Sequence, residues 1–519
     1  MNSVGAHDLL RRYGDHPAIV MAGSGRTVSY GELDERSTRL ARVFDEAGLR
    51  PGDHVALMLG NQPEFFDVLW ASFRSGLYVT PINWHLGTDE AAYIIGDSDA
   101  KAFVTSSDLA GVATQLSSRL PNVALRLMVG GAIDGYEDFE ATLEGASAEP
   151  RVDERSGALM LYSSGTTGYP KGIVRPLPSQ PFGATSDAIA LLMSHRYGAD
   201  SRSVYLTPAP LYHAAPVGFS TGIQRIGATV VVMERFDAEA ALRTIEESAV
   251  THAQFVPTHF IRMLHLPEAV RTRYDLSSLE CVIHAAAPCP VPTKRRMIEW
   301  LGPIVEEYYA GSEAVGVTLI SSHEWLEHPG SVGRPAGDVV HIVDGEGREL
   351  AVGDTGHVWF EATSRFVYNN DPAKTSTAQN DRGWATYGDI GHLDDDGYLY
   401  LTDRASNMII SGGVNIYPQE AEMVLSAHPA VYDVAVVGAP DSDMGEMVKA
   451  FVQLRPEVDE SDQMAEELIA YCRERLAHFK CPRQVAFLAA LPRLETGKLV
   501  KRKLLDQQHS SSGPDVPTT

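Results

Sequence analysis

The 519-residue chain is poor in cysteine and forms no pattern with the few cysteines it has. Cys281, Cys289, Cys472 and Cys481 include no Cys-x-x-Cys pair, and none has a histidine at zinc-ligand spacing. This argues against a zinc module and against a disulfide scaffold. We therefore expect buried free thiols of a reducing cytosol.

Positive charge and long apolar runs are also scarce. Lysine and arginine total 43 against 68 aspartates and glutamates, a formal net charge of −25. Such a charge argues against bulk binding of nucleic acid or of an anionic membrane, so a polyanion site must be built locally. The N-terminus has no basic segment followed by an apolar one, and no apolar run approaches membrane-spanning length. We predict a cytoplasmic protein with no membrane span and no nucleic-acid partner.

What the chain does contain is a layered α/β pattern. At this length it should form at least two domains. Up to about residue 400, short apolar runs alternate with longer amphipathic ones, which predicts an α/β architecture. The predicted strands are 54–59, 102–105, 158–161, 204–206, 228–233 and 282–286, and the predicted helices are 30–47, 64–75 and 238–248.

Short strands and Gly/Asp turns fill residues 353–404, with a hairpin turn at 395–397. A smaller α/β unit follows, with predicted helices 418–426 and 462–476 and a strand at 432–437. The end of the chain is rich in Ser, Pro and Gly and is expected to be disordered.

The most informative segment is 162–172, which reads Tyr-Ser-Ser-Gly-Thr-Thr-Gly-Tyr-Pro-Lys-Gly. Its glycines let the backbone approach a ligand closely, and its hydroxyls and Lys171 supply donors. These groups suit a polyphosphate. The segment is no P-loop, because Pro170 and Lys171 stand where that motif needs Gly-Lys. The alternative, a polar surface linker, accounts poorly for the ordered run.

Four further segments of the sequence extend this prediction. Glu313 ends a strand and turn, and is the hard oxygen ligand that Mg²⁺ prefers beside phosphates. Asp389 is suited to accept both hydroxyls of a ribose. Gly412-Gly413 opens the small domain, and Lys498 lies near its end. Each alone could be a turn residue, a cap, a hairpin or one charge of a cluster. Together, and in this order, such separate structural roles account poorly for them.

On these motifs the chain resembles the adenylate-forming superfamily of acyl-CoA synthetases, adenylation domains and firefly luciferase, from about residue 25 to about 505. Residues 210–216 and 411–418 are most similar to bacterial fatty-acyl or related acyl-CoA ligases. The resemblance implies a large N-terminal α/β domain of layered β-sheets and helices, with a small β-barrel-like part, and a smaller mobile C-terminal α+β domain. The implied boundaries are 1–403 for the large domain, 404–407 for the hinge, 408–505 for the small domain and 506–519 for a disordered tail.

The resemblance also implies roles for individual residues. ATP or AMP would be bound by Ser163, Ser164, Gly165, Thr166, Thr167, Gly168, Lys171, Ala285, Ala286, Ala287, Pro288, Tyr309, Ala310, Gly311, Ser312, Asp389, Arg404 and Lys498. Within this set, residues 163–171 would cover the β- and γ-phosphates. Tyr309 would stack on adenine, and Asp389 with Arg404 would bind ribose.

The remaining implied roles concern chemistry and movement. The catalytic set would be Lys498, Glu313, Thr166 and His213, with Glu313 holding Mg²⁺, Lys498 reaching the α-phosphate and the substrate carboxylate, and His213 gating the acyl pocket. CoA would be bound by Ser411, Gly412 and Gly413. Ser406 would be the hinge.

The implied activity is an ATP-dependent acid–thiol ligase, and its partners are a carboxylic acid, ATP and CoA. The acid attacks the α-phosphorus of ATP, pyrophosphate leaves, and a thiol then takes the acyl group from AMP. Mg²⁺ and Lys498 would place positive charge where negative charge gathers. An acyl carrier protein as acceptor and a homodimer as oligomeric state both stay open.

Two departures and two alternatives accompany this interpretation. Ser406 replaces the usual Asp or Lys, and Ala310 replaces a usual Gly. An amino-acid-activating or carrier-loading enzyme is the first alternative, although amino-acid activation would favour a carboxylate near Ala214-Ala215. A non-catalytic nucleotide-binding protein is the second. Lys498, Glu313 and Lys171 together argue against it.

The acyl substrate is expected to be apolar. The candidate walls, 182–196, 212–221, 255–263 and 316–321, are rich in Ala, Gly, Met and Leu. They suit an aliphatic chain or a bulky ring held by burial. Of the nearby histidines only His213 is assigned a role, since His259 and His265 are more typical of packing residues.

Overall fold

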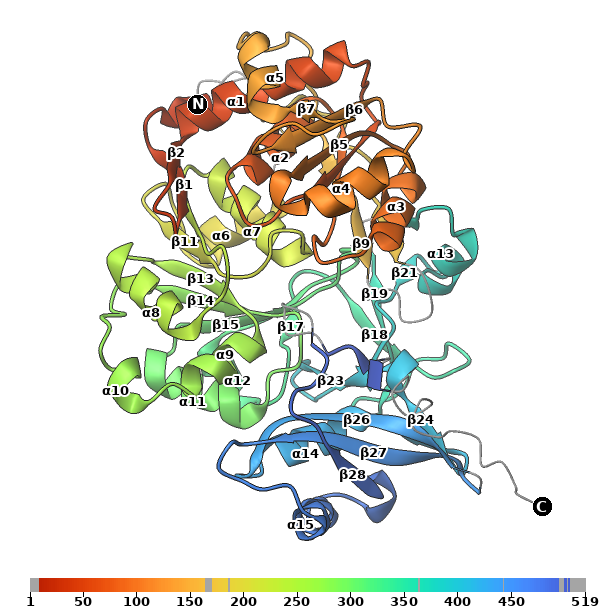
Figure 1. The fold of residues 1–519 in the computed structure, drawn as a ribbon. Coiled ribbons are helices and arrows are strands. Elements are labelled where there is room, and N and C mark those ends of the chain that lie inside the picture. The colour runs from red at the N-terminus through yellow and green to blue at the C-terminus, as the bar shows by residue number, and fades with distance from the viewer. Residues whose placement is uncertain are drawn as a thin grey trace, which may run out of the picture. The chain divides into compact units, whose positions relative to one another are not determined.

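The structure is a computed structural model, and it divides the chain into two compact units. It describes residues 9–163, 170–184, 187–362, 365–441, 443–493, 499–501 and 503–504. The first unit is Met1–Phe255, Leu266–Ile283 and Ser364–Thr377, and the second is Val256–His265, His284–Thr363 and Ala378–Thr519. Several sheets with helices and a separate C-terminal domain confirm the predicted α/β class (Figure 1).

A parallel six-stranded sheet organises the start of the first unit, in the order β7-β6-β5-β3-β4-β8. The strands are β3 (His54–Met58), β4 (Tyr78–Pro81), β5 (Ala100–Ser106), β6 (Leu125–Val129), β7 (Glu137–Asp138) and β8 (Ala158–Leu159). Parallel strands are buried on both faces, which explains their nearly continuous apolar sequences. The predicted strands 54–59 and 102–105 are β3 and β5, within two residues at each end.

Helices α3 (Thr88–Asp97) and α4 (Ala110–Ser117) cover one face of this sheet. Ile94, Ile95 and Leu116 are buried against Phe103 of β5 and Met128 of β6. An apolar stripe on each amphipathic helix therefore closes the core on this side.

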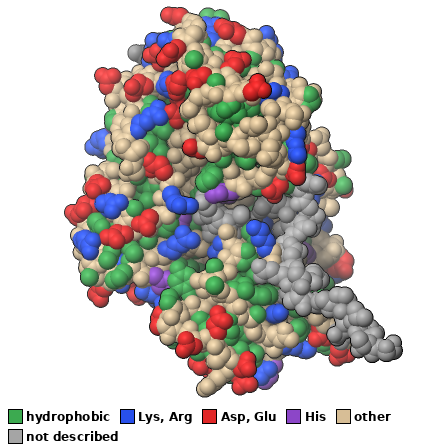
Figure 2. Space-filling view, viewed as in Figure 1, with side chains coloured by type: hydrophobic (Ala, Val, Ile, Leu, Met, Phe, Trp, Pro, Cys, Tyr) green, Lys and Arg blue, Asp and Glu red, His purple; other side chains and the backbone are tan. Residues whose placement is uncertain are grey.

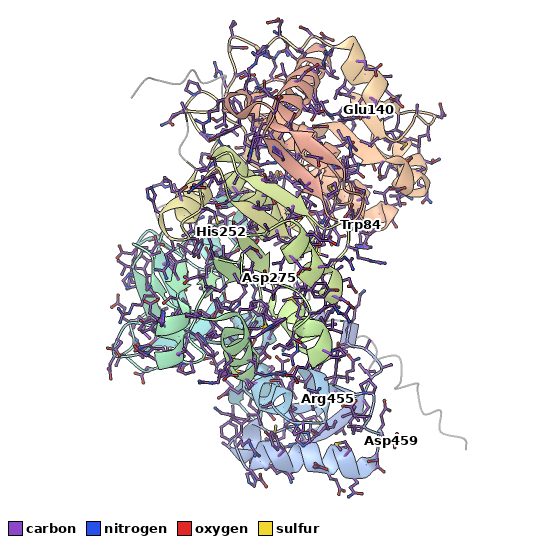
Figure 3. The ribbon with its side chains drawn as sticks, turned by 90° about the vertical axis from the view of Figure 1, so that its left-hand side faces the viewer. Trp84, Glu140, His252, Asp275, Arg455 and Asp459 are labelled. Atoms are coloured by element: carbon purple, nitrogen blue, oxygen red, sulfur yellow. The ribbon has the colours of Figure 1, made fainter. Side chains whose placement is uncertain are left out.

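Three other helices of the first unit are linked by one arginine. They are α1 (Tyr30–Glu46), α2 (Glu64–Arg74) and α5 (Phe139–Gly145). Arg36 of α1 donates from Nε to Asp67 of α2 at 2.8 Å, and from both Nη atoms to Glu140 of α5. Figure 3 labels Glu140. Burial raises the pKa of Asp67 to about 7, and Arg36 opposes that rise. The predicted helices 30–47 and 64–75 each end one residue beyond α1 and α2.

A second set of strands in the first unit follows the order β14-β13-β11-β12-β1-β2. They are β1 (Pro17–Met21), β2 (Thr27–Ser29), β11 (Val204–Thr207), β12 (Thr229–Val232), β13 (His252–Phe255) and β14 (Cys281–His284). Its helices include α6 (Ala188–His195), α7 (Ala214–Arg225), α8 (Ala238–Glu247) and α10 (Glu268–Arg271). The predicted strand 282–286 therefore ends at His284, two residues early.

The prediction of a single strand over 158–161 was wrong. β8 pairs in parallel with β4, whereas β9 (Leu161–Ser163) pairs antiparallel with β10 (Lys171–Val174), which also pairs with β20 (Val367–Tyr368). Met160 is fully buried between them. A change of sheet and of partner direction breaks one apolar run into two short strands.

The second unit contains two further groups of hydrogen-bonded strands outside the C-terminal domain. One has the order β17-β16-β15, formed by Arg334–Pro335, Thr318–Ile320 and Val305–Tyr309. The other has the order β18-β19-β22-β23, with β21 beside β19, formed by Val340–Val343, Gly356–Glu361, Asp389–Leu393, Leu399–Arg404 and Trp384–Ala385. β22 and β23 are antiparallel, as the predicted turn at 395–397 requires. The helices are α9 (Pro257–Leu264), α11 (Val291–Leu301) and α12 (Ser322–Glu327).

The C-terminal domain is a sheet with a different cover on each face. β24 (Ile409–Ser411), β25 (Val414–Ile416), β26 (Val431–Asp441), β27 (Gly445–Leu454) and β28 (Gln484–Phe487) form it, beside α14 (Pro418–Ser426) and α15 (Asp462–Arg473). Val434 and Val436 of β26 pack with Leu425 and Leu468 of the helices. The alternate residue Val437 packs with Leu491 and Leu504. The two-residue period of a strand thus serves two cores.

The structure locates the surface charges and the four cysteines of the chain. Figure 2 shows acidic side chains spread among basic ones over the viewed face. Cys281, Cys472 and Cys481 are buried free thiols, and Cys289 is a partly buried one. Within the part of the chain that the structure describes, no helix is both long and apolar enough to cross a membrane.

Candidate functional site

The structure brings together the three residues assigned to adenine and ribose. Strands β22 and β23 place Asp389 directly opposite Arg404, and Arg404 Nε lies 3.3 Å from Asp389 Oδ1. Tyr309, the last residue of β15, donates its hydroxyl proton to Asp389 Oδ2 at 2.5 Å. Tyr309 lies 80 positions before Asp389 in the sequence and Arg404 lies 15 positions after it, and both meet its carboxylate.

That carboxylate is buried. Asp389 is 6% exposed, and burial raises its pKa while Arg404 opposes the rise. Burial, and then the neighbouring Asp389 charge, raise the pKa of Tyr309 well above its usual value, so the phenol stays the donor. Tyr309 and Arg404 are both hydrogen-bond donors to this buried acceptor, and the hydroxyls of a ribose are donors that can replace them.

Tyr387 is a residue of this site that the sequence reasoning missed. Its hydroxyl accepts the backbone N–H groups of Val315 at 2.9 Å and Gly316 at 3.2 Å, and donates to the Gly316 carbonyl at 2.8 Å. Burial raises the pKa of Tyr387 to about 12. The hydroxyl thus anchors the turn that follows β15. The only signal in the sequence was that Tyr387 stands two residues before Asp389. That position does not show that Tyr387 contacts the turn at Val315 and Gly316.

The same ring explains Gly311. A Cβ at this position would lie 2.4 Å from ring atoms of Tyr387 and 3.0 Å from Oε2 of Glu313. Only glycine lets the backbone pass so close to both. The turn that carries Ala310, Ser312 and Glu313 is consequently held against Tyr387.

Glu313 fits a magnesium role by its chemistry. Its carboxylate is partly exposed at an anchored turn, and carboxylate oxygen is the ligand type that Mg²⁺ takes. Across the described ranges, no three His, Cys, Asp or Glu side chains are grouped as a complete metal cage. A magnesium ion at Glu313 would therefore take its other ligands from water and from substrate phosphates, as Mg²⁺ commonly does.

Backbone strain marks two of the predicted nucleotide segments. Ala286, in the loop 285–288 after β14, has φ of 76°, and Ala314, beside Glu313, has φ of 54°. For a residue with a Cβ, this left-handed backbone conformation costs about 1–2 kcal/mol. Asp99 and Ala249, also with positive φ, follow the ends of α3 and α8, where helices commonly terminate this way. Strain away from helix ends is a feature of ligand sites.

A buried ion pair lies behind these segments, and sequence reasoning missed it too. Lys294 of α11 lies 2.5 Å from Oε2 of Glu307 in β15, with side-chain exposures of 0% and 7%. His284 Nε2 lies 3.4 Å from the same oxygen, and Lys294 Nζ lies over the ring of Trp325. Burial raises the pKa of Glu307 and lowers that of His284 well below its usual value. The cluster joins His284, the last residue of β14, to Glu307 at the centre of β15. The loop 285–288 follows His284, and Tyr309 ends β15.

The Gly-rich segment is described only at its two ends. Ser163 in β9 pairs with Lys171 in β10, and Lys171 Nζ lies 2.7 Å from Oδ2 of Asp371. Tyr162 donates to Asp97 at 2.6 Å. The assigned residues between and beyond these ends, Ser164, Gly165, Thr166, Thr167, Gly168 and Lys498, lie outside the described residues.

The residues predicted near the acyl pocket lie at a helix start, at a helix contact and in the core. His213 is the N-cap residue of α7, and its ring lies 4.3 Å from that of Tyr212. A Cβ at Gly218 or at Gly222 would lie 2.8 Å from Ile189 of α6, so both glycines serve helix packing. His259 is 1% exposed, and burial lowers its pKa to about 3, which agrees with a packing histidine.

The residues assigned to CoA and to the hinge lie at tight backbone features. Gly412 and Gly413 form the two-residue turn between β24 and β25, with φ of 57° and 80°. Ser411 is buried at the end of β24. Ser406 lies in a 3₁₀ turn, Ala405–Asn407. The CoA, hinge and domain-boundary assignments stay predictions.

Comparisons with known proteins identify the family of the chain. Residues 7–366 match the model of the family "AMP-binding enzyme", and residues 420–498 match "AMP-binding enzyme C-terminal domain". The chain is 31% identical to a fatty acid–[acyl-carrier-protein] ligase, ScoC, of Streptomyces coeruleorubidus, over 96% of this chain and 95% of the relative. It is also 31% identical to the long-chain-fatty-acid–CoA ligase FadD13 of Mycobacterium tuberculosis, over 96% of both chains.

A solved structure supports the same grouping. The amide bond synthetase McbA of Marinactinospora thermotolerans superposes with a TM-score of 0.82 at 27% identity, covering 97% of this chain and 99% of that one. Both family matches and the relatives at 31% identity lead to one conclusion: this chain belongs to the AMP-binding enzymes, the adenylate-forming family of acyl-CoA ligases and related enzymes.

Proposed function

We propose that this enzyme activates an apolar carboxylic acid as its acyl-adenylate and transfers the acyl group to CoA, releasing AMP and pyrophosphate. The observation that carries the proposal is the meeting of Tyr309, Asp389 and Arg404 at one buried carboxylate. This arrangement suits the adenosine half of ATP. A relative named as a fatty-acyl CoA ligase supports the choice of acid and acceptor.

In the proposed first step the acid attacks the α-phosphorus of ATP. Asp389 and Arg404 fix the ribose, and Tyr309 offers its ring to adenine, so the α-phosphate is held in one position. Lys171 meets the departing phosphates and Lys498 meets the carboxylate and the α-phosphate. Mg²⁺ held by Glu313 would neutralise phosphate charge.

In the proposed second step a thiol attacks the acyl-adenylate. The Gly412-Gly413 turn would line the path of the pantetheine arm once the C-terminal domain turns about Ser406. Lys498 has no role in this second step, because its positive charge acts only while the carboxylate attacks the α-phosphate.

An acyl carrier protein is the second candidate acceptor, favoured by one specific observation. One relative at the same identity is named as a ligase for fatty acid and acyl-carrier protein. Both acceptors present a phosphopantetheine thiol, so the acceptor must be decided by experiment.

The test is pyrophosphate release from ATP and Mg²⁺ across a panel of carboxylic acids, with CoA, with a phosphopantetheinylated carrier protein, and with neither. Acid-dependent release with a CoA thioester supports the proposal. Release with thioester formed only on the carrier protein would favour the second candidate. Failure of every acid to release pyrophosphate would contradict ligase activity, and ATP binding without turnover would then indicate a nucleotide-binding protein.

Lys498 offers an internal control. We expect Lys498→Ala to stop adenylation while pre-made acyl-adenylate still yields thioester, because its charge acts on the first step alone. Equal loss of both steps would contradict the role proposed for Lys498.

A further inference from the structure

Asp371 forms an ion pair with the lysine of the Gly-rich segment. Its Oδ2 atom lies 2.7 Å from Lys171 Nζ. Its Oδ1 atom accepts the backbone N–H of Lys374 at 2.9 Å, at the start of α13 (Pro372–Ala378). The carboxylate is thereby fixed to a helix terminus by one oxygen and presents the other to the ammonium.

The backbones on both sides of this contact are fixed as well. The Asn369 N–H donates to the carbonyl of Gly172 at 2.7 Å, next to Lys171. The Asn369 side chain donates to the backbone oxygen of Asp97 at 2.6 Å, and Tyr162 donates to the Asp97 carboxylate. With the main chain fixed, the long lysine side chain is the part of this contact that can change partner.

The pair is exposed enough to exchange. The side chains of Lys171 and Asp371 are 32% and 22% exposed, and ion pairs in such surroundings are weak. The hydrogen bond with Asp371 raises the pKa of Lys171, and the reciprocal bond lowers the pKa of Asp371. Both groups are therefore charged at neutral pH. A polyphosphate, which carries several negative charges, can take the ammonium from a single carboxylate.

We propose that Asp371 is a positioning residue that holds Lys171 in the nucleotide-free enzyme, yields it to ATP, and takes it back as pyrophosphate leaves. The inference rests on the proposed function, because it needs Lys171 to bind the phosphates of ATP. Asp371 then lowers the apparent affinity for ATP and for pyrophosphate alike, since each must first displace it. Weaker retention of pyrophosphate favours its release.

The test is Asp371→Asn in the full-length enzyme. Asparagine caps a helix as well as aspartate does, so the variant retains the α13 contact and loses only the charge. We expect the KM for ATP and the inhibition constant of pyrophosphate to fall together, by about two- to fivefold. The change should shrink at high ionic strength because salt screens exposed charges. Damage to the fold would not raise both affinities.

Asp237→Asn is the matched control, since Asp237 caps α8 through Ala240 in the same way. It should leave both constants unchanged. If Asp371→Asn proves unstable in thermal melts, Asp371→Ser also retains a capping oxygen and should give the same result. A wild-type enzyme that exchanges ATP and pyrophosphate, together with a folded variant whose constants are unchanged or higher, overturns this inference alone. A wild type with no acid-dependent exchange overturns the proposed function and the inference with it.

Discussion

Two lysine–carboxylate pairs of similar length lie in different surroundings. Lys294 and Glu307 are 2.5 Å apart with exposures of 0% and 7%, whereas Lys171 and Asp371 are 2.7 Å apart with exposures of 32% and 22%. In the buried pair, neither charge can leave without stranding the other in a low-dielectric interior. In the exposed pair, water or a ligand can replace either partner. Burial, more than distance, decides whether an ion pair stabilises the fold permanently or can exchange one partner for a ligand.

The pair formed by Asp389 and Arg404, which we propose binds ribose, combines a buried and an exposed partner. Asp389 is buried, yet its partner Arg404 has a side chain that is 47% exposed. One fixed acceptor and one replaceable donor are what a site needs if it is to be ordered when empty and still admit a ligand.

The largest effect should come from breaking the buried pair. Lys294→Met leaves Glu307 buried without its cation, and we expect a loss of about 3–5 kcal/mol in the free energy of unfolding. The double variant Lys294→Met/Glu307→Leu should recover most of that loss, since an apolar pair of similar volume needs no counter-charge. Denaturant unfolding measures both. A single variant as stable as the wild type would show that the pair does not behave as buried.

The next effect separates ligand binding from stability at Asp389. Asp389→Asn should raise the Kd for ATP by about ten- to a hundredfold, as for loss of hydrogen bonds to a charged group. Its stability relative to wild type should rise from pH 4 to pH 7, because an acid whose folded pKa is raised stabilises the fold only below that pKa. Calorimetric titration and thermal melts at each pH test this. A variant with unchanged ATP affinity would remove Asp389 from the ribose site.

The pH dependence of stability tests how burial affects the charge of His259. Its folded pKa of about 3 lies below the unfolded value, so its contribution is full above about pH 6.5 and is lost as the pH falls. At pH 5 the wild type should have lost about 2 kcal/mol from this residue. His259→Gln does not titrate and should lose less between pH 7 and pH 5 in denaturant unfolding. Parallel pH curves for the two proteins would contradict the buried neutral histidine.

The smallest stability effect should come from the exposed pair. Lys171→Met should leave Tm within about 2 °C of wild type, because a part-exposed ion pair contributes little to folding. The same change should raise the KM for ATP, since the phosphates lose a cation. Scanning calorimetry beside steady-state kinetics makes the comparison. A large fall in Tm would mean that Lys171 and Asp371 belong with the buried pair.

Sequence patterns predicted the amphipathic helices well because their signal is local. α1, α2 and α8 each end one residue before the predicted end, and the Ser29 capping box marks where α1 begins. Residues 158–161 show the limit of such signals. An apolar run does not say which sheet each half will join, and here Met160 separates two sheets.

Small residues were open to more than one interpretation. The Gly and Ala content of 212–221 suggested an apolar acyl wall, yet Gly218 is small because Ile189 packs against it. Close packing and an open pocket both select small side chains, so composition alone does not distinguish them.

The sequence by itself determined the α/β class, the family and the nucleotide motifs, because apolar periodicity and short runs of glycine, hydroxyl and charge are written in neighbouring residues. The tertiary structure alone decided that Tyr309, Asp389 and Arg404 share one carboxylate, that Tyr387 anchors the glutamate turn, and that Asp371 holds Lys171. These contacts join positions 15 to 200 residues apart. Burial and pairing across such separations follow from how strands and helices pack, which no local pattern records.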